Sequence, residues 1–405
     1  MATIFQKLLR YPGVQRLVNM SASEALSAAE PIAWFLATAP IFIYTLRQAP
    51  KSRWWLLPAN VFPAVQCYRT VNQLSGYLPG LDWLLAFTTL IYIIHSTSAL
   101  YLERWVLPSK SPAAPTHWEA TMAFKAWMNP RRLALSDVAG LNKATGVQQL
   151  LFALWRLVPV VVLGAVYVAL ELSLLLFLTP MPRDFGPSHQ GHFHWGLDRA
   201  AVFRAVFALH WAWLTYLILT AAHAVLAVFF VSVLQLDEPK EWPLLYGNPF
   251  RACSIQRFWG VFWHRLGTES QLHYGKVVSR DLLGLRARSA TEKAFLAFRG
   301  FTVSGVVHAL VTFKTEPEAD LLSDMWFLQL NFVGGLLELA VRQMRGRRPS
   351  SPSQRVLRYC VGHLWLFLFL YCVVPPYQFP VLHRAAVRRM PFKVNMKMNR
   401  KISLS

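Results

Sequence analysis

Two histidines stand in strongly apolar surroundings in the second half of the chain. His264 lies near the end of the run SIQRFWGVFWHRL, residues 254–266, and His308 lies near the middle of GFTVSGVVHALVTF, residues 300–313. Imidazole takes up and releases protons near neutral pH, which suits it to acid–base chemistry. An ionisable side chain inside an apolar membrane segment is costly and by default indicates a functional site. Both histidines are therefore candidates for chemistry.

The run around His264 predicts a helix with two unlike sides, because a helix turns by about 100° per residue. The aromatic residues share one side: Phe258, Trp259, Phe262 and Trp263. Arg257, Gly260 and His264 share the other side, where Gly260 leaves room for another chain or a ligand. The alternative is a helix that anchors the chain at the membrane interface, with His264 tolerated at its polar edge.

The run around His308 predicts a second helix with a narrow polar stripe. Ser304, Gly305 and Thr312 lie three or four residues from His308 and share its face. A small, polar stripe on an apolar helix is typical of the lining of a cavity. The alternative is a buried histidine that is hydrogen-bonded to a neighbouring helix.

The composition of the chain indicates that a membrane surrounds these helices. Of the 405 residues, 55% are hydrophobic and 15% are charged, whereas roughly 25% are charged in soluble domains. Several apolar blocks approach the roughly 20 residues that cross a bilayer as a helix. The blocks lie at about 31–46, 54–68, 81–101, 150–178, 201–234, 295–313, 325–343 and 358–376. We predict an all-α integral membrane protein with about eight spans in a single domain, residues 1–405.

The formal charge of +21 has two explanations in such a protein. Lysine and arginine lie mostly in short loops and at the tail, as expected for membrane flanks in contact with lipid, so no nucleic acid is expected as a partner. Excess positive charge also attracts anionic substrates, of which phosphates are the obvious candidates. The four cysteines are scattered without a CxxC pair, which indicates neither a zinc site nor a disulfide framework.

Two motifs in fixed order resemble a known family. EWPLLYGNPFRACSIQRFWGVFWHRL, residues 241–266, is followed by SGVVHAL, residues 304–310. The pair is similar to the wax-synthase-like branch of the membrane-bound O-acyltransferases. More narrowly, it resembles the fungal acetyltransferases that esterify hydroxyl groups of terpenoids and other secondary metabolites. The resemblance covers about 241–310, which we take as the catalytic motif region.

The resemblance implies a fold, a reaction and two roles. Members form a helical bundle that encloses a tunnel, with amphipathic helices at the interface, and they take acyl groups from acyl-CoA as a co-substrate, without a metal or a bound cofactor. His308 matches the essential intramembrane histidine, and it would act as the base that accepts the proton of the acceptor hydroxyl. His264 matches the second conserved polar position, and it would orient the acyl donor or stabilise the oxyanion. Ala309 follows His308, whereas many members outside the wax-synthase branch have an acidic residue soon after this histidine.

The remaining candidates would bind substrate. The residues expected to contact the CoA phosphates or the substrates are Arg257, Trp259, Trp263, Arg265, Lys276, Arg280 and Ser304. Each cation has an alternative as a solvated or headgroup-facing charge. Glu338 shares a helix face with Asn331, Gly334 and Gly335, and this face is expected to line the acceptor end of a tunnel; the alternative is hydrogen bonding between helices.

Together these features predict an acyltransferase of the endoplasmic reticulum membrane. It would move an acyl group, with acetyl expected from the resemblance, from CoA to a hydroxyl of a hydrophobic small molecule such as a terpenoid, in secondary-metabolite biosynthesis. The nearest variant is a wax-ester synthase that uses long-chain acyl-CoA and a fatty alcohol. A transporter with a histidine proton relay is the alternative from another class. It predicts related halves and paired broken helices, and the sequence shows neither clearly.

Overall fold

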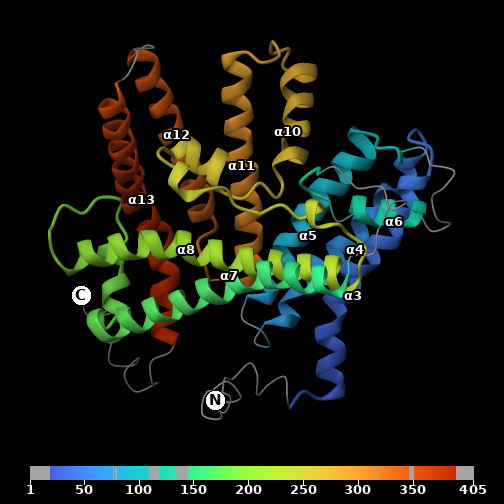
Figure 1. Ribbon diagram of the computed structural model, residues 1–405, viewed down its shortest axis with the longest axis horizontal. Coiled ribbons are helices and arrows are strands. Elements are labelled where there is room, and N and C mark those ends of the chain that lie inside the picture. The colour runs from blue at the N-terminus through green and yellow to red at the C-terminus, as the bar shows by residue number, and fades with distance from the viewer. Residues whose placement is uncertain are drawn as a thin grey trace. The chain divides into compact units, whose positions relative to one another are not determined.

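Helices form every regular element that the structure describes. The computed structural model describes residues 19–75, 77, 80–108, 118–127, 129–133, 145–316, 318–345 and 351–388. Within these ranges the chain folds into helices joined by turns and irregular segments (Figure 1). The predicted all-α class is confirmed.

Six of the helical segments are long and apolar enough to cross a membrane. They are α3 (Ala22–Arg47), α5 with its continuation (Leu81–Leu102), α7 with its continuation (Gly146–Leu178), α8 with its continuation (Arg199–Val233), α11 (Ala290–Thr315) and α13 (Pro352–Arg388). Each contains most of one predicted apolar block. The multi-span character predicted from the sequence is therefore confirmed, whereas the described residues contain six candidate spans and not eight.

The two other predicted blocks form helices that do not qualify as spans. Block 54–68 becomes α4 (Leu57–Thr70), whose 14 residues extend for about 21 Å, less than the roughly 30 Å of the hydrocarbon core. Block 325–343 lies in α12 (Leu321–Arg345), which has 25 residues but includes Asp324, Asn331 and Glu338. The first helix is too short, and the second is too polar.

The chain divides into two compact units, each assembled from separate stretches. The first unit comprises Met1–Ala144, Leu234–Pro243 and Arg265–Met325. It contains α3, α4, α5, α6 (Trp118–Trp127), α10 (Thr268–Lys276) and α11. Helix α5 contributes to both of its hydrophobic clusters: Tyr92 packs with Phe42 and Trp127, and Phe87 packs with Val307. The helix that carries His308 is thus held against the centre of the first unit.

A buried ion-pair cluster fixes the segment that precedes the opening motif. The Lys125 ammonium of α6 lies 2.7 Å from the Glu241 carboxylate and 3.4 Å from that of Asp237. All three side chains are largely shielded from solvent. Arg131 also donates from Nη1 to the carbonyl oxygen of Pro243 over 3.1 Å. These contacts bind the segment Leu234–Pro243 to the first unit.

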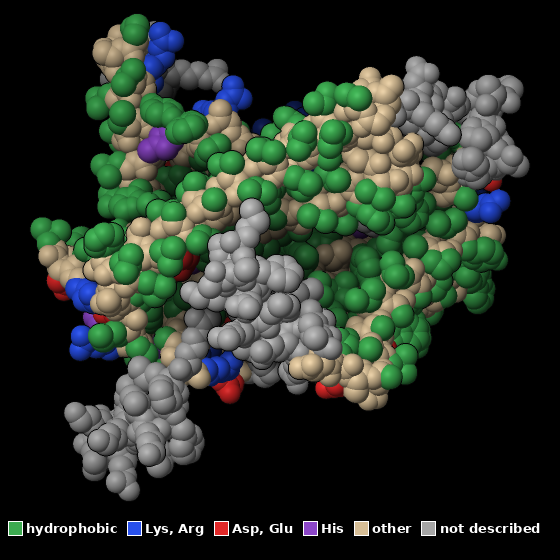
Figure 2. Space-filling view, turned by 60° about the horizontal axis from the view of Figure 1, so that its bottom comes forward, with side chains coloured by type: hydrophobic (Ala, Val, Ile, Leu, Met, Phe, Trp, Pro, Cys, Tyr) green, Lys and Arg blue, Asp and Glu red, His purple; other side chains and the backbone are tan. Residues whose placement is uncertain are grey.

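The second unit comprises Thr145–Val233, Leu244–His264 and Trp326–Ser405. Helices α7 (Gly146–Ser173) and α8 (Arg199–Val228) run side by side, and α8 also packs against α13 (Figure 1). A small aromatic core fixes the end of this packing, with Phe185, Phe203, Phe207 and Phe379 in mutual contact. Much of α7 exposes leucine and valine, and Figure 2 shows hydrophobic side chains over much of the visible surface, as contact with lipid requires.

Candidate active site

The imidazole of His308 rests on an aromatic surface provided by α5 (Leu81–Thr97). Its ring centroid lies 5.3 Å from that of Phe87 and 6.5 Å from that of Trp83. The Phe87 and Trp83 rings stack on each other at 5.4 Å with only 4° between their planes. Because these two residues are one helical turn apart, they present one continuous aromatic surface to the imidazole. His308 therefore lies on a helix and among apolar neighbours, as predicted.

Packing, and not hydrogen bonding, orients this imidazole within the described part of the chain. Neither ring nitrogen of His308 has a hydrogen bond or an ion pair with a described residue, and the side chain is half-buried. The alternative of a histidine hydrogen-bonded to a neighbouring helix thus has no counterpart among these residues.

One residue of the predicted polar stripe around His308, Gly305, lies in a contact between helices. A Cβ atom at Gly305 would lie 3.1 Å from the Cα of Met325, so this glycine permits α11 and the start of α12 to approach closely. Ser304 is half-buried beside it. The expectation that Gly305 lines a cavity is therefore wrong, because the neighbouring backbone occupies that space.

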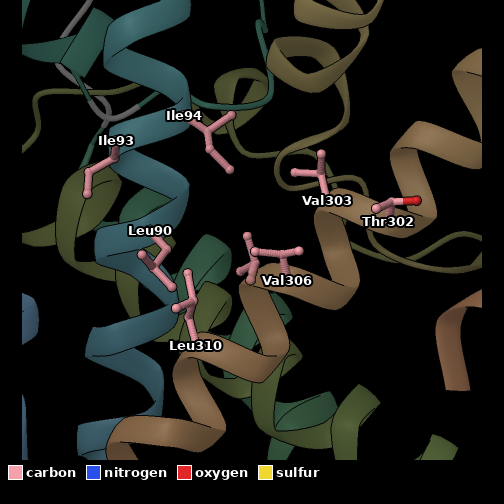
Figure 3. Close-up of a pocket in the computed structure, with 8 residues that line it drawn as sticks. Leu90, Ile93, Ile94, Thr302, Val303, Val306 and Leu310 are labelled. Atoms are coloured by element: carbon pink, nitrogen blue, oxygen red, sulfur yellow. The ribbon is translucent and has the colours of Figure 1, made fainter. Parts of the chain in front are cut away.

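A cavity of about 250 Å³ lies between α11 and α5 (Figure 3), on a different face of α11 from His308. Its lining consists of Leu90, Ile93, Ile94, Thr302, Val303, Val306, Val307 and Leu310. The one hydroxyl among them, that of Thr302, donates to the carbonyl oxygen of Phe298 in its own helix over 2.9 Å. The cavity offers hydrocarbon surface, and His308 is not among the residues that line it.

The segment that carries His264 is not the single helix that its periodicity predicts. It forms a three-residue turn, α9 (Ile255–Arg257), followed by a π-helical turn over Phe258–Phe262. Trp263 then adopts an extended backbone with φ −65° and ψ 151°, so His264 lies beyond the helix. The prediction that His264 shares a helix face with Arg257 and Gly260 is therefore wrong.

A contact from another segment explains where this helix ends. The N–H of Gly247 donates to the carbonyl oxygen of Phe262 over 2.8 Å, which takes that carbonyl out of the helical ladder. A Cβ atom at Gly247 would lie 2.0 Å from the carbonyl oxygen of Val261, so only glycine allows this approach. The π-helical turn closes with a 2.7 Å hydrogen bond from Trp263 N–H to Phe258 C=O.

Aromatic rings surround His264 within the second unit. Tyr246 meets its ring edge-on at 5.6 Å, and Trp263, itself buried, stacks on Trp211 of α8 at 5.2 Å. Burial raises the pKa of the Tyr246 phenol, which therefore stays protonated at neutral pH. Tyr246 belongs to the YGNP stretch of the sequence, and nothing in that stretch predicts its contact with His264. The contact of Tyr246 with His264 depends on the end of the π-helical turn at Phe262, which the periodicity of the sequence does not predict.

The predicted substrate-binding residues are not equally available. Arg257 donates from Nε to the carbonyl oxygen of Arg251 over 2.8 Å, and Arg280 pairs with the buried Glu292 at 2.6 Å. Arg265 is exposed and lies 3.5 Å from Glu269, and Lys276 is exposed. Arg257 belongs to the second unit and the other three cations to the first. Their contact with CoA remains a prediction.

Two further predicted residues, Glu338 and Trp259, form hydrogen bonds between α12 and the segment 254–266. Glu338 of α12 accepts hydrogen bonds from the backbone N–H groups of Ile255 and Gln256 at 2.6 and 3.0 Å. Trp259 donates from Nε1 to Asn331 of the same helix over 2.9 Å. For Glu338, the alternative to a place in the tunnel lining was hydrogen bonding between helices. Its hydrogen bonds to Ile255 and Gln256 are contacts of this kind between two segments.

Comparison with known proteins identifies the relatives of this chain. Residues 242–330 match the membrane bound O-acyl transferase family. The matched stretch contains both His264 and His308, and it overlaps most of the region 241–310 on which the predicted resemblance depends. Over this stretch the chain is similar to the membrane-bound O-acyltransferases. No solved structure matches the chain.

Curated relatives of this O-acyltransferase-like chain are fungal proteins named acetyltransferases. The acetyltransferase ataH of Aspergillus terreus is 29% identical over 152 residues, which cover 36% of this chain and 49% of the relative. The acetyltransferase aurG of Calcarisporium arbuscula is 27% identical over 180 residues, which cover 44% of this chain and 43% of the relative. The acetyltransferase eriL of Hericium erinaceus is 24% identical over 204 residues, or 48% and 49% of the two chains. The matches thus span less than half of these relatives.

Proposed function

We propose that this chain is an O-acyltransferase that moves an acetyl group from acetyl-CoA to a hydroxyl of a hydrophobic small molecule such as a terpenoid. The observation that carries the proposal is the family match over the stretch that holds both histidines, one of which has no polar partner among the described residues. The names of the fungal relatives favour acetyl over longer acyl groups. We place the reaction in the membrane of the endoplasmic reticulum and in secondary-metabolite biosynthesis.

The proposed reaction begins with proton transfer to His308. The neutral imidazole accepts the proton of the acceptor hydroxyl as its oxygen attacks the thioester carbonyl, so that a carbon–oxygen bond forms. Collapse of the tetrahedral intermediate breaks the carbon–sulfur bond, and the proton passes from His308 to the CoA thiolate. General base catalysis of this kind contributes typically 10²- to 10⁴-fold. The aromatic surface of Phe87 and Trp83 keeps the imidazole in one orientation during these steps.

The second role belongs to His264 in this proposal. It orients the acyl donor or stabilises the negative charge that develops on the carbonyl oxygen, because a fixed donor is most effective where charge appears. Packing against Tyr246 and Trp263 restricts its ring, which limits the reorganisation needed at each turnover. The two roles predict separate effects of substitution at His308 and at His264.

The cavity between α5 and α11 supports a hydrophobic acceptor. Its volume of about 250 Å³ is just below the 300–1,000 Å³ typical of small-molecule sites, so it suits part of a terpenoid hydrocarbon and not a whole molecule. An acceptor that buries a hydrocarbon portion between α5 and α11 would be held against the helix that carries His308. A water-soluble acceptor would gain nothing from such a lining.

Acyl transfer by the purified full-length protein in detergent tests this function. Radiolabelled acetyl-CoA and palmitoyl-CoA are each supplied with a panel of terpenoid and fatty alcohols, and membranes from cells without the gene serve as the control. We expect label from acetyl-CoA in an organic-soluble ester of a terpenoid alcohol. Faster transfer of palmitoyl to a fatty alcohol would identify a wax-ester synthase, and transfer from neither donor would contradict the proposal.

A further inference from the structure

The helical turns that precede His264 are too short to be stable by themselves. The turn α9 has 3 residues and the following π-helical turn has 5, whereas isolated helices shorter than about 12 residues are marginal in water. Ser254 caps the first turn by accepting from the N–H of Arg257 over 3.1 Å. The remaining N–H groups at the start of this helix need partners from elsewhere in the fold.

The carboxylate of Glu338 of α12 is the hydrogen-bond partner of two of these N–H groups. Its Oε1 accepts from the N–H of Ile255 over 2.6 Å, and its Oε2 accepts from the N–H of Gln256 over 3.0 Å. The negative charge also lies where the helix dipole favours it. Trp365 of α13 donates from Nε1 to the same Oε1 over 2.9 Å, which fixes the carboxylate from its other side.

Asn331 holds the motif at a second point, two turns before Glu338 on the same face of α12. Its Oδ1 accepts from Trp259 Nε1 over 2.9 Å, and its Nδ2 donates to the carbonyl oxygen of Phe327 over 2.8 Å. The second bond fixes which end of the Asn331 amide faces the indole. Asn331 is 1% exposed, so this contact is shielded from water and from exchange with it.

One glycine of α12 and one of α13 allow the motif to lie close against both helices. A Cβ atom at Gly334 would lie 2.6 Å from Cδ1 of Ile255, and one at Gly362 would lie 2.3 Å from the carbonyl oxygen of Cys253. Gln256 donates from Nε2 to the carbonyl oxygen at position 335 over 2.8 Å. The face formed by Asn331, Gly334, Gly335 and Glu338 is named here the α12 platform.

We infer that the α12 platform positions the catalytic motif, with Glu338 as a positioning residue that acts through the backbone of residues 255–256 on His264. This inference rests on the proposed function, in which His264 is a reacting group. A series of contacts connects Glu338 through the π-helical turn to Trp263, which is stacked on Trp211 and precedes His264. Misplacement of a catalytic group by about 1 Å can reduce a rate by about 10²-fold, so loss of this anchor reaches the chemistry.

Histidine reactivity in the full-length protein tests the inference without measuring catalysis. Diethyl pyrocarbonate modifies accessible imidazoles, and peptide mass spectrometry gives the rate for each histidine. We expect Glu338→Gln to raise the rate at His264 by at least about threefold, because local opening exposes it, and to leave His383 of the same unit unchanged. Glu171→Gln, the same substitution at another carboxylate of that unit, should leave the rate at His264 unchanged. An unchanged rate at His264 in Glu338→Gln, or an equal rise at both histidines, would overturn the inference.

A double-mutant cycle adds the catalytic readout. Glu338→Gln should lower kcat about tenfold in the wild-type background and not at all in the His264→Ala background, because the two residues act as one unit. The same fractional loss in both backgrounds would contradict positioning through His264. If the wild type transfers no acyl group, the proposed function fails, while the labelling rates still decide whether Glu338 positions His264.

A milder variant covers a failure of Glu338→Gln to fold. Trp259→Phe keeps an aromatic ring, although a smaller one, and removes the hydrogen bond to Asn331. It should raise the labelling rate of His264 by about twofold and lower kcat in the wild-type background alone. If His264 of this variant is modified at the wild-type rate, Asn331 has no positioning role.

Discussion

The ring of His308 lies 5.3 Å from the ring of Phe87, with 44° between their planes. The proposed base is thus oriented by an aromatic neighbour, and the described residues give it no carboxylate partner. In the sequence, Ala309 and not an acidic residue follows His308. Neither imidazole nitrogen has a hydrogen-bond partner among the described residues.

Replacement of Phe87 should disturb the base without removing it. Phe87 is 6% exposed, so Phe87→Leu leaves a partly filled gap beside the imidazole and should lower the free energy of unfolding by about 1–3 kcal/mol. We expect kcat for acyl transfer to fall about tenfold as the imidazole gains rotational freedom. Phe313→Leu changes an exposed ring on the same helix as His308 and should leave the rate unchanged. Equal rates in the two variants would show that Phe87 does not orient the base.

Two glycines near the motif should respond differently to alanine. The Cβ of Gly247→Ala would meet the carbonyl oxygen of Val261 at 2.0 Å, so this variant should lose about 1–3 kcal/mol of stability. Gly260 has open space around its Cβ position, so Gly260→Ala should unfold at the wild-type temperature. Thermal unfolding of both variants in detergent checks the contrast. Wild-type stability of Gly247→Ala would contradict the close crossing at Phe262.

Two of the predicted CoA-binding cations should differ in their effects. Lys276 is exposed and Arg280 pairs with the buried carboxylate of Glu292 at 2.6 Å. Lys276→Ala should raise KM for acetyl-CoA severalfold through loss of a phosphate contact, with little change in thermal stability. Arg280→Ala should mainly lower the unfolding temperature, since it leaves the carboxylate of Glu292 without its cation. An unchanged KM for acetyl-CoA in Lys276→Ala would remove that residue from the binding site.

The pH dependence of stability should reveal the contact between Asp184 and Arg199. The Arg199 guanidinium, which donates to Asp184 over 2.8 and 2.9 Å, holds the pKa of that carboxyl below its usual value. The unfolded chain has the ordinary pKa of about 3.9, so ionised Asp184 stabilises the fold above that pH. The stabilisation is lost as the pH falls through the lower pKa of the folded state. Unfolding temperatures of wild type and Asp184→Asn should therefore differ at pH 6 and converge toward pH 3, and a constant difference would contradict this account.

Local patterns in the sequence predict much of this fold because local contacts create it. The long apolar blocks become the six candidate spans, and His308 lies on a helix among apolar side chains as its surroundings indicate. Residues that one helix carries at offsets of three and four share a face whatever they contact. Periodicity therefore groups Asn331, Gly334 and Glu338 correctly.

The sequence does not reveal what that face contacts, because the partner lies far along the chain. Glu338 and Ile255 are 83 residues apart in sequence, and their hydrogen bond forms only in the folded chain. The same polar residues make α12 too polar to qualify as a span, so the predicted count of eight exceeds the six found among the described residues. The end of the helix before His264 depends equally on a distant donor, the N–H of Gly247.

The most direct test of the proposed chemistry compares His308→Ala with His363→Ala. Both variants remove a histidine from a candidate membrane span, but the Nδ1 of His363 bonds to the carbonyl oxygen of Tyr359 within its own helix. Acetyl transfer is measured with labelled acetyl-CoA and the alcohol that the wild type esterifies, at matched amounts of folded protein. We predict that His308→Ala loses about 10²- to 10⁴-fold in rate while His363→Ala stays near wild type. Ester formation by His308→Ala at the wild-type rate would contradict its assignment as the base.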